Sequence, residues 1–150
     1  VMNHGRIEQS GNADTLYRLP ENAFVTEFLG ETDSFEGRIE RGQWHYRGYA
    51  WPLPPGKRWQ EQSALGYIRP HEWQIDSEHP MLRAAIESLH HTGALTRLTL
   101  REQAPNGQTL QASFAATEAD RLGLAPGQIL PLAPRQVYVF SHSDLIEYAI

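Results

Sequence analysis

One short stretch of the sequence contains the residue types that bind catalytic zinc. The segment at 71–75, HEWQI, begins like the His-Glu-x-x-His motif of zinc proteases. Position 75 is isoleucine, so the segment lacks the second imidazole that would hold a metal ion on the same helical face. The favoured interpretation is a loop histidine and a loop carboxylate that follow Pro70. We expect no metal site here.

Three further histidines stand near groups that could support catalysis. The segment SHSD at 141–144 contains the three residue types of a catalytic triad. Triads are assembled across a fold, and a flexible tail cannot preorganise an oxyanion hole. His90 and His91 offer two imidazoles, but adjacent residues of a strand point to opposite faces. We expect no catalytic residues, and the alternative is a small hydrolase that gathers His71, His90 or His91 with a carboxylate.

Aromatic residues are interspersed with arginines in the first half of the chain. They could stack on bases as the platform of an OB-type module that binds single-stranded nucleic acid. The chain carries 13 Lys and Arg against 18 Asp and Glu, a net charge of −5. This balance argues against a nucleic-acid partner, because such affinity comes mainly from neutralising phosphates. We therefore expect the aromatics to be core residues: Trp44, Tyr46, Tyr49, Trp51, Trp59 and Trp73.

Composition restricts the remaining classes of protein. The 150 residues are 40% hydrophobic, which suits one ordinary domain or a compact domain with an appendage. The absence of cysteine excludes disulfides, thiolate zinc sites and thiol nucleophiles. No stretch matches the phosphate-binding patterns G-x-x-x-x-G-K-[ST] or G-x-G-x-x-G. No apolar run approaches the length of a transmembrane helix.

The order of predicted elements indicates a mainly β fold. The first eleven residues predict a hairpin that turns at 3–5, and residues 12–29 predict two short helices broken by Pro20. From residue 34 the chain alternates apolar and polar residues, with strands separated by glycine turns. The Pro- and Gly-rich loop at 52–63 is the best internal boundary, and a strand at 64–69 resumes at 72–75 after Pro70.

The segment at 80–93 fits either a helix that ends at Gly93 or a strand that turns at 91–93. The return strand after it is clear, and Pro105-Asn106-Gly107 predicts another hairpin turn. Thr117 is expected to cap a short helix that stops at Gly123. Strands with turns about every ten residues suggest a small, closed, OB-like five-stranded barrel.

Several separated stretches resemble the C-terminal part of one family, the ATP-binding subunits of bacterial ABC importers, sulfate/thiosulfate type. The opening VMNHGRIEQSG is similar to the hairpin that closes the nucleotide-binding domain. The stretch LYRLPENAFVTEFLGETDSFEG is similar to the two helices that lead out of that domain and into the appended module. The stretches WPL and YIRPHEWQI resemble the TOBE (transport-associated OB) module. The ending LAPGQILPLAPRQVYVF is similar to the end of that module.

This resemblance implies an organisation into three parts. Residues 1–30 are expected to be the end of a nucleotide-binding domain, 31–140 a TOBE regulatory domain of two small OB-like β-subdomains, and 141–150 a tail. The resemblance also implies that 80–93 is a strand. The motifs that bind ATP and Mg²⁺ would lie upstream, so we expect this segment to bind no cofactor and to catalyse no reaction.

The resemblance also implies partners and a location. The module would stand beside a second copy in a homodimer, with the transporter's membrane subunits contacted through the upstream domain. It would lie on the cytoplasmic face of the plasma membrane and could sense an oxyanion or a regulatory protein. An oxyanion needs arginine side chains and free N–H groups, so Arg69 beside His71 is the leading candidate contact. The alternative is a structural arginine tied to Glu72 or Asp76.

Overall fold

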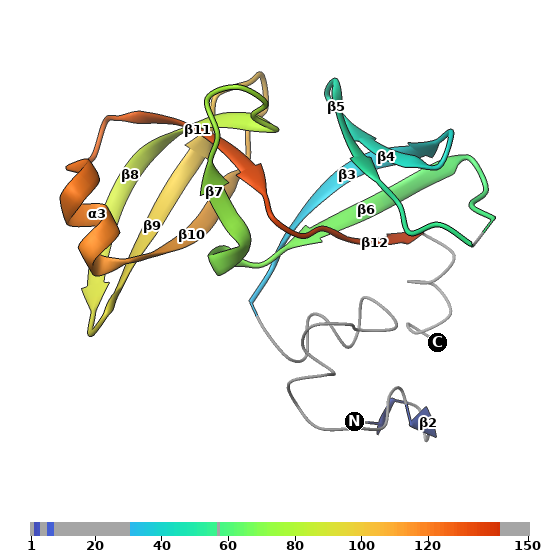
Figure 1. Cartoon of the computed structure of the whole chain (residues 1–150), viewed down its shortest axis with the longest axis horizontal. Coiled ribbons are helices and arrows are strands. Elements are labelled where there is room, and N and C mark those ends of the chain that lie inside the picture. The colour runs from blue at the N-terminus through green and yellow to red at the C-terminus, as the bar shows by residue number, and fades with distance from the viewer. Residues whose placement is uncertain (1, 4–5, 8–30, 57, 142–150) are drawn as a thin grey trace. The chain divides into compact units, whose positions relative to one another are not determined.

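The computed structural model describes residues 2–3, 6–7, 31–56 and 58–141. The chain divides into two compact units (Figure 1). Unit 1 contains the chain up to Ile68 and again from Val137, and unit 2 is the continuous segment Arg69–Gln136. Each unit is built on an antiparallel five-stranded sheet, so the expected mainly β fold is confirmed. The expected borders at residues 30 and 140 stay predictions.

Unit 1 forms its sheet in the order β12-β6-β3-β4-β5. The strands β3, β4 and β5 are consecutive antiparallel neighbours, and β6 crosses back to pair with β3. β12 returns from the far end of the sequence to pair with β6. The strands are β3 (Asp33–Glu40), β4 (Gln43–Tyr46), β5 (Tyr49–Pro52), β6 (Gln62–Ile68) and β12 (Tyr138–Ser141).

Trp44 is the centre of the unit 1 core. Its side chain is fully buried, and its indole Nε1 donates a hydrogen bond to the carbonyl oxygen of Ala64 at 3.1 Å. Glycines at 37 and 66 leave room for the ring, because a Cβ at either position would collide with it. Tyr46 stacks on the indole with ring centroids 6.0 Å apart. The alternation predicted for β3 and β4 thus produces a packed aromatic core.

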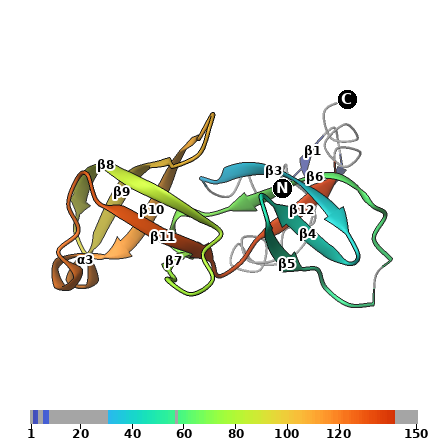
Figure 2. The ribbon, with the colours of Figure 1, turned by 90° about the horizontal axis from the view of Figure 1, so that it is seen from above.

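Unit 2 forms its sheet in the order β10-β9-β8-β11-β7 (Figures 1 and 2). A 3₁₀ helix precedes the first strand of the unit, and a single α-helix separates β10 from β11. The elements are η1 (Pro70–Glu72), β7 (Trp73–Ile75), β8 (Leu82–Thr92), β9 (Leu95–Glu102), β10 (Thr109–Ala115), α3 (Ala116–Leu122) and β11 (Ile129–Pro134).

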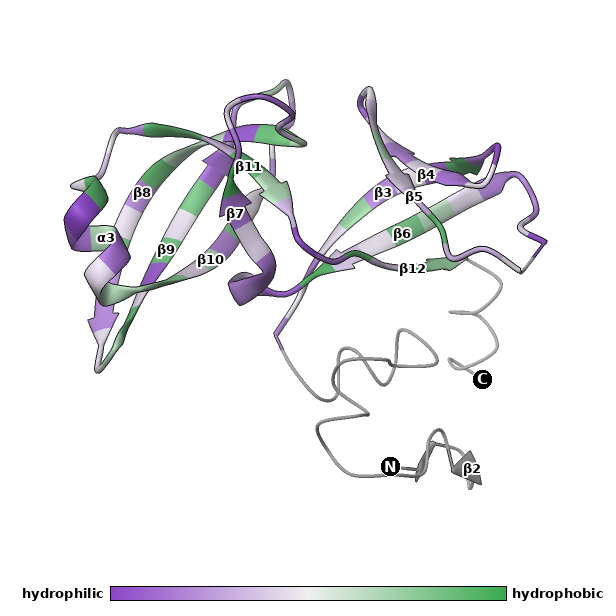
Figure 3. Ribbon diagram, viewed as in Figure 1, coloured by the Kyte–Doolittle hydropathy of each residue, from purple (hydrophilic) through white to green (hydrophobic). Residues whose placement is uncertain are grey.

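The core of unit 2 follows from alternation along its strands, which a bulge shifts by one residue in β8. Figure 3 shows the changing hydropathy colours along β8, β9 and β10. Leu98 and Leu100 of β9 are fully buried, and their partners on β10 are Ala112 and Leu110. Polar residues occupy the intervening positions and face the other side of the sheet. Alternation along β9 and β10 thus places their apolar residues on the buried face.

The expected closed barrel is not observed. Among the described residues, neither sheet pairs its first strand with its last, so both sheets are open. In unit 2 the edge strand β10 instead contacts η1, which is too short to continue a strand ladder. A one-turn helix therefore fills the position at which a closing strand pair would be needed.

The ambiguous segment at 80–93 is a strand, as the family resemblance implies. β8 pairs with β9 as far as Thr92 and turns at Gly93, whose φ is +61°. A β-bulge interrupts the register between Ile86 and Ser88. The bulge shifts the inward face of β8 by one residue, from even-numbered positions before it to odd-numbered positions after it. Because of this shift, the apolar residues of the strand are spaced as they would be in a helix.

Three local predictions are wrong. The helix α3 begins after Ala115 with no side-chain cap, so Thr117 is not its cap, although Gly123 does end it with a φ of +64°. The loop at 52–63 is not a boundary, because β5 and β6 on either side of it belong to one sheet. The strand at 64–69 does not resume at 72–75, because β7 pairs with β11 in unit 2.

The predicted N-terminal hairpin is present as two short strands. β1 (Met2–Asn3) and β2 (Arg6–Ile7) pair antiparallel, with Met2 opposite Ile7. The two helices expected at 12–29 and the tail beyond Ser141 lie outside the described residues.

Candidate functional site

Arg69 lies at the first residue of unit 2, directly before η1. Its backbone is extended, with φ −82° and ψ 150°, as expected for a residue that precedes proline. The side chain is only 2% exposed, and its Nη2 lies 3.3 Å from Oε1 of Glu72. The turn of η1 brings these two side chains, three positions apart, onto the same side.

His71 contacts the same carboxylate from the solvent side. Its Nε2 lies 3.4 Å from Oε1 of Glu72, and its side chain is about half exposed, at 51%. The Glu72 side chain is 17% exposed. The two candidate residues named from the sequence therefore converge on one carboxylate oxygen, Arg69 from the interior and His71 from the surface.

Arg135 completes the cluster and was not found from the sequence. Its backbone N–H donates to the carbonyl of Glu72 at 2.7 Å, and its Nη1 donates to the carbonyl of His71 at 3.5 Å. It follows the end of β11, which pairs with β7 and so carries residue 135 beside η1. Arg135 is 64 positions from His71 in the chain, so no local sequence pattern connects the two residues.

The geometry assigns different capacities to these side chains. A buried guanidinium that is paired with a carboxylate is largely neutralised, and an anion could reach Arg69 only by displacing Glu72. This is the structural alternative considered for Arg69. His71 and Arg135 are solvent-accessible, so an anion or an acidic partner could contact them without unfolding the turn. The cluster thus offers a cationic surface beside a paired carboxylate, an arrangement that can bind an anion.

The other histidines have separate surroundings. His91 Nδ1 lies 2.8 Å from the hydroxyl of the buried Thr96, and His90 is exposed on the opposite face of the same strand. Within the described ranges, no three His, Asp or Glu side chains lie close enough to hold a metal ion. Of the histidines named for the hydrolase alternative, His71 contacts the Glu72 carboxylate, whereas His90 and His91 lie on β8, so the three are not gathered around one carboxylate.

Of the six aromatic residues expected in the core, three are buried and three, Tyr49, Trp51 and Trp59, are only partly buried. Trp44 and Trp73 are fully buried, and Tyr46 is 5% exposed. These rings belong to the cores of the two units, where they cannot stack on bases. The alternative of a module that binds single-stranded nucleic acid therefore loses three of the six rings of its platform.

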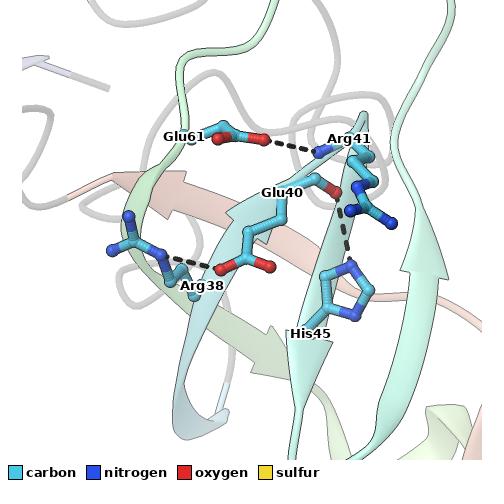
Figure 4. A network of polar contacts seen from close by, with 5 residues as sticks. All are labelled: Arg38, Glu40, Arg41, His45 and Glu61. Atoms are coloured by element: carbon cyan, nitrogen blue, oxygen red, sulfur yellow. Dashed lines mark hydrogen bonds and ion pairs between the residues drawn. The ribbon is translucent and has the colours of Figure 1, made fainter.

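A second polar cluster lies on the surface of unit 1 (Figure 4). Arg38 Nε lies 3.0 Å from Glu40 Oε1, and His45 Nε2 lies 3.3 Å from the Glu40 carbonyl oxygen. The backbone N–H of Arg41 donates to Glu61 Oε2 at 3.2 Å. The Arg41–Glu61 hydrogen bond links the β3–β4 turn to the residue before β6, and the other two contacts lie within the β3–β4 hairpin. A structural role therefore accounts for all three.

A search for membrane-spanning helices identifies none in the part of the chain that the structure describes. The fold itself is similar to that of a solved structure, a cytoplasmic molybdate-binding protein, ModG, with molybdate bound. The TM-score is 0.56 at 13% identity, over 73% of this chain and 95% of that chain. At this identity the likeness establishes the fold alone.

Sequence comparisons identify relatives along the whole chain. Residues 34–75 match the family described as the CysA C-terminal regulatory domain. The sulfate/thiosulfate import ATP-binding protein CysA of Neisseria meningitidis serogroup B is 57% identical over 100% of this chain. That of Nitrosomonas europaea is 34% identical over 93% of it.

The chain spans about two fifths of the length of these relatives, 42% and 40% respectively. The family match begins in β3 and ends with β7, so it includes η1 with Arg69, His71 and Glu72 but not Arg135. By these matches, the chain is similar along its whole length to sulfate/thiosulfate import ATP-binding proteins, and within it residues 34–75 match the CysA C-terminal regulatory domain family.

Proposed function

We propose that this chain is the non-catalytic regulatory module of the ATPase subunit of a sulfate/thiosulfate importer, and that it acts by pairing with a second copy of itself. The observation that supports this most strongly is 57% identity to a sulfate/thiosulfate import ATP-binding protein over the entire chain. Among the described residues, no group of three His, Asp or Glu side chains could hold a metal ion.

The proposal includes the rest of the transporter. ATP and Mg²⁺ are bound and ATP is hydrolysed by a nucleotide-binding domain outside this segment, which also contacts the membrane subunits. The module lies on the cytoplasmic face of the plasma membrane and holds two ATPase subunits together while their nucleotide-binding domains open and close. Among the described residues both antiparallel sheets are open, which suits a contact role of this kind.

Light scattering at several protein concentrations tests the pairing. We expect the average mass to rise towards twice that of the 17.0 kDa chain as concentration increases. A mass that stays at the monomer value throughout would contradict self-pairing as a property of this module.

A second candidate function is oxyanion sensing, because the fold neighbour binds molybdate. The accessible groups of the Glu72 cluster, His71 and Arg135, are the contacts we propose for an anion. Calorimetric titration with sulfate, thiosulfate and molybdate is the test, with Arg135→Gln as the weakened variant. Arg38→Gln is the matched control, because Arg38 is an exposed arginine of unit 1. Equal heats from both variants, or no heat at millimolar anion, would remove this candidate.

A further inference from the structure

Strand β8 has an open edge over half of its length. On one side it pairs with β9 from Ala84 to Thr92, whereas on the other it pairs with β11 only over Leu82–Ala85. Over the segment Ser88–Thr92, no strand in the described part of the chain occupies that second side. This segment, here called the β8 edge, forms the end of the β8–β9 hairpin at the lower left of Figure 1.

The hydrogen-bond ladder determines which backbone groups face the open side. The N–H of Ala116 donates to the carbonyl of Ala94, so in this register the even-numbered residues of β9 bond to β10 and the odd-numbered ones to β8. The β8 residues opposite those odd-numbered positions bond back to β9. The residues between them, Leu89 and His91, therefore direct their N–H and C=O groups outward.

The bulge before Ser88 creates this arrangement. Ahead of it, Ile86 directs its N–H to the carbonyl of Gln128 and accepts from the N–H of Gly127, so even-numbered residues face β11. The extra residue shifts the pattern by one, and the chain of β11 ends its contact at the same point. The outward groups of Leu89 and His91 thus begin where the neighbouring strand stops.

We propose that the β8 edge pairs antiparallel with the β8 edge of a second copy, about a two-fold axis at His90. In this register Leu89 lies opposite His91 of the second copy, and His91 opposite Leu89. Both are hydrogen-bonded pairs, so all four outward N–H groups of the two edges find carbonyl acceptors. The inference rests on the self-pairing proposed above and names the surface that carries it.

The edge is complementary to itself in length and in side chains. The open segment and the segment that would cover it are the same five residues, so the pairing ends where β11 begins on each copy. Ser88 would lie opposite Thr92 of the second copy, which places two hydroxyl-bearing side chains together. Natural edges are commonly protected by lysine, proline or inward-pointing charges, and the β8 edge contains none of them.

Disulfide trapping tests this register directly, because the chain contains no cysteine. Facing residues of a non-hydrogen-bonded antiparallel pair have Cα atoms about 4.5 Å apart, within the range that disulfides span. We expect the full chain carrying His90→Cys to form a covalent dimer under mild oxidation. Arg83→Cys is the matched control, since residue 83 is exposed on the same strand where β11 already covers the edge.

The expected difference follows from effective concentration. Paired thiols experience an effective concentration of the order of millimolar, so at tens of micromolar protein His90→Cys should cross-link roughly tenfold or more faster than the control. Leu89→Pro added to His90→Cys removes an outward N–H but no hydrogen bond to β9. It should therefore reduce the cross-linking rate of His90→Cys to that of the Arg83→Cys control. Circular dichroism checks that each variant keeps the β spectrum of the parent chain.

The outcomes separate this inference from the proposed function. A mass that rises with concentration in light scattering, together with equal cross-linking of His90→Cys and Arg83→Cys, would overturn the β8 edge and leave self-pairing standing. A monomer at every concentration without preferential cross-linking would overturn both. Preferential cross-linking that Leu89→Pro does not reduce would overturn the backbone pairing.

Discussion

A methyl group added at Gly66 should destabilise unit 1 by overpacking its aromatic core. An ideal Cβ at this position would lie 2.5 Å from Cζ2 and 2.6 Å from Cη2 of Trp44. These ring atoms belong to a fully buried side chain that is also held by the hydrogen bond to Ala64, so they cannot move aside freely. We expect Gly66→Ala to cost about 1–3 kcal/mol of unfolding free energy, the usual range for overpacked cores.

Trp44→Phe should relieve the collision, because phenylalanine lacks the outer ring atoms that approach Gly66. Alone, this substitution leaves the Ala64 carbonyl without its indole donor and should cost about 1–3 kcal/mol for that unsatisfied group. The double variant should be more stable than the sum of the single effects predicts, by about 1–2 kcal/mol, as expected for residues in contact.

Thermal unfolding followed by circular dichroism measures the stability of the parent chain, the two single variants and the double variant. In a chain of this size, Tm is expected to fall by about 2–4 °C for each kcal/mol of lost stability. Gly123→Ala is the control, because nothing lies within 4 Å of its added Cβ and its cost comes from the φ of +64° alone. That cost should be unchanged by Trp44→Phe. Strict additivity between Gly66→Ala and Trp44→Phe would refute the steric explanation.

Three further predictions use the same unfolding measurement. Arg69→Met should cost about 2–4 kcal/mol of unfolding free energy, because it leaves the mostly buried Glu72 carboxylate without its arginine partner. Arg38→Met breaks an exposed ion pair and should cost at most about 1 kcal/mol. Similar losses of stability in the two variants would contradict the buried pair. Thr117→Ala should change stability by less than about 0.5 kcal/mol, and a loss near 1 kcal/mol would restore the helix cap expected from the sequence. Leu132→Ala should cost about 2–5 kcal/mol and Ile129→Ala far less, since the first is fully buried and the second 55% exposed; equal costs would contradict the packing of β11.

Local features of the fold were predictable where one short segment determines them. The turn at Arg41-Gly42 has positive φ values of 53° and 73°, as its glycine suggests, and the strands around it alternate as expected. The family resemblance, and not periodicity, resolved 80–93, because a bulge makes a strand carry apolar residues at helical spacing. The cap at Thr117 failed because a suitable residue type does not guarantee the geometry of a cap.

Features that depend on distant pairings could not be predicted. The change from unit 1 to unit 2 occurs between Ile68 and Arg69, where no glycine or serine run marks a linker. Glu72 and Asp76 were the two carboxylate partners predicted for Arg69, and the structure pairs it with Glu72. This contact was predictable because residues i and i+3 are close in the chain. Arg135 joins the cluster only through the pairing of β7 with β11, which no short pattern encodes.

The return of β12 to unit 1 has a consequence for how the chain folds during synthesis. Tyr67 of β6 pairs with Tyr138 of β12, and the whole of unit 2 is made between them. Closing so long a loop while it is unstructured costs entropy, and the cost falls when the intervening chain is already compact. As the chain leaves the ribosome, unit 2 should therefore fold first, and the last strand of unit 1 should be added as the final step.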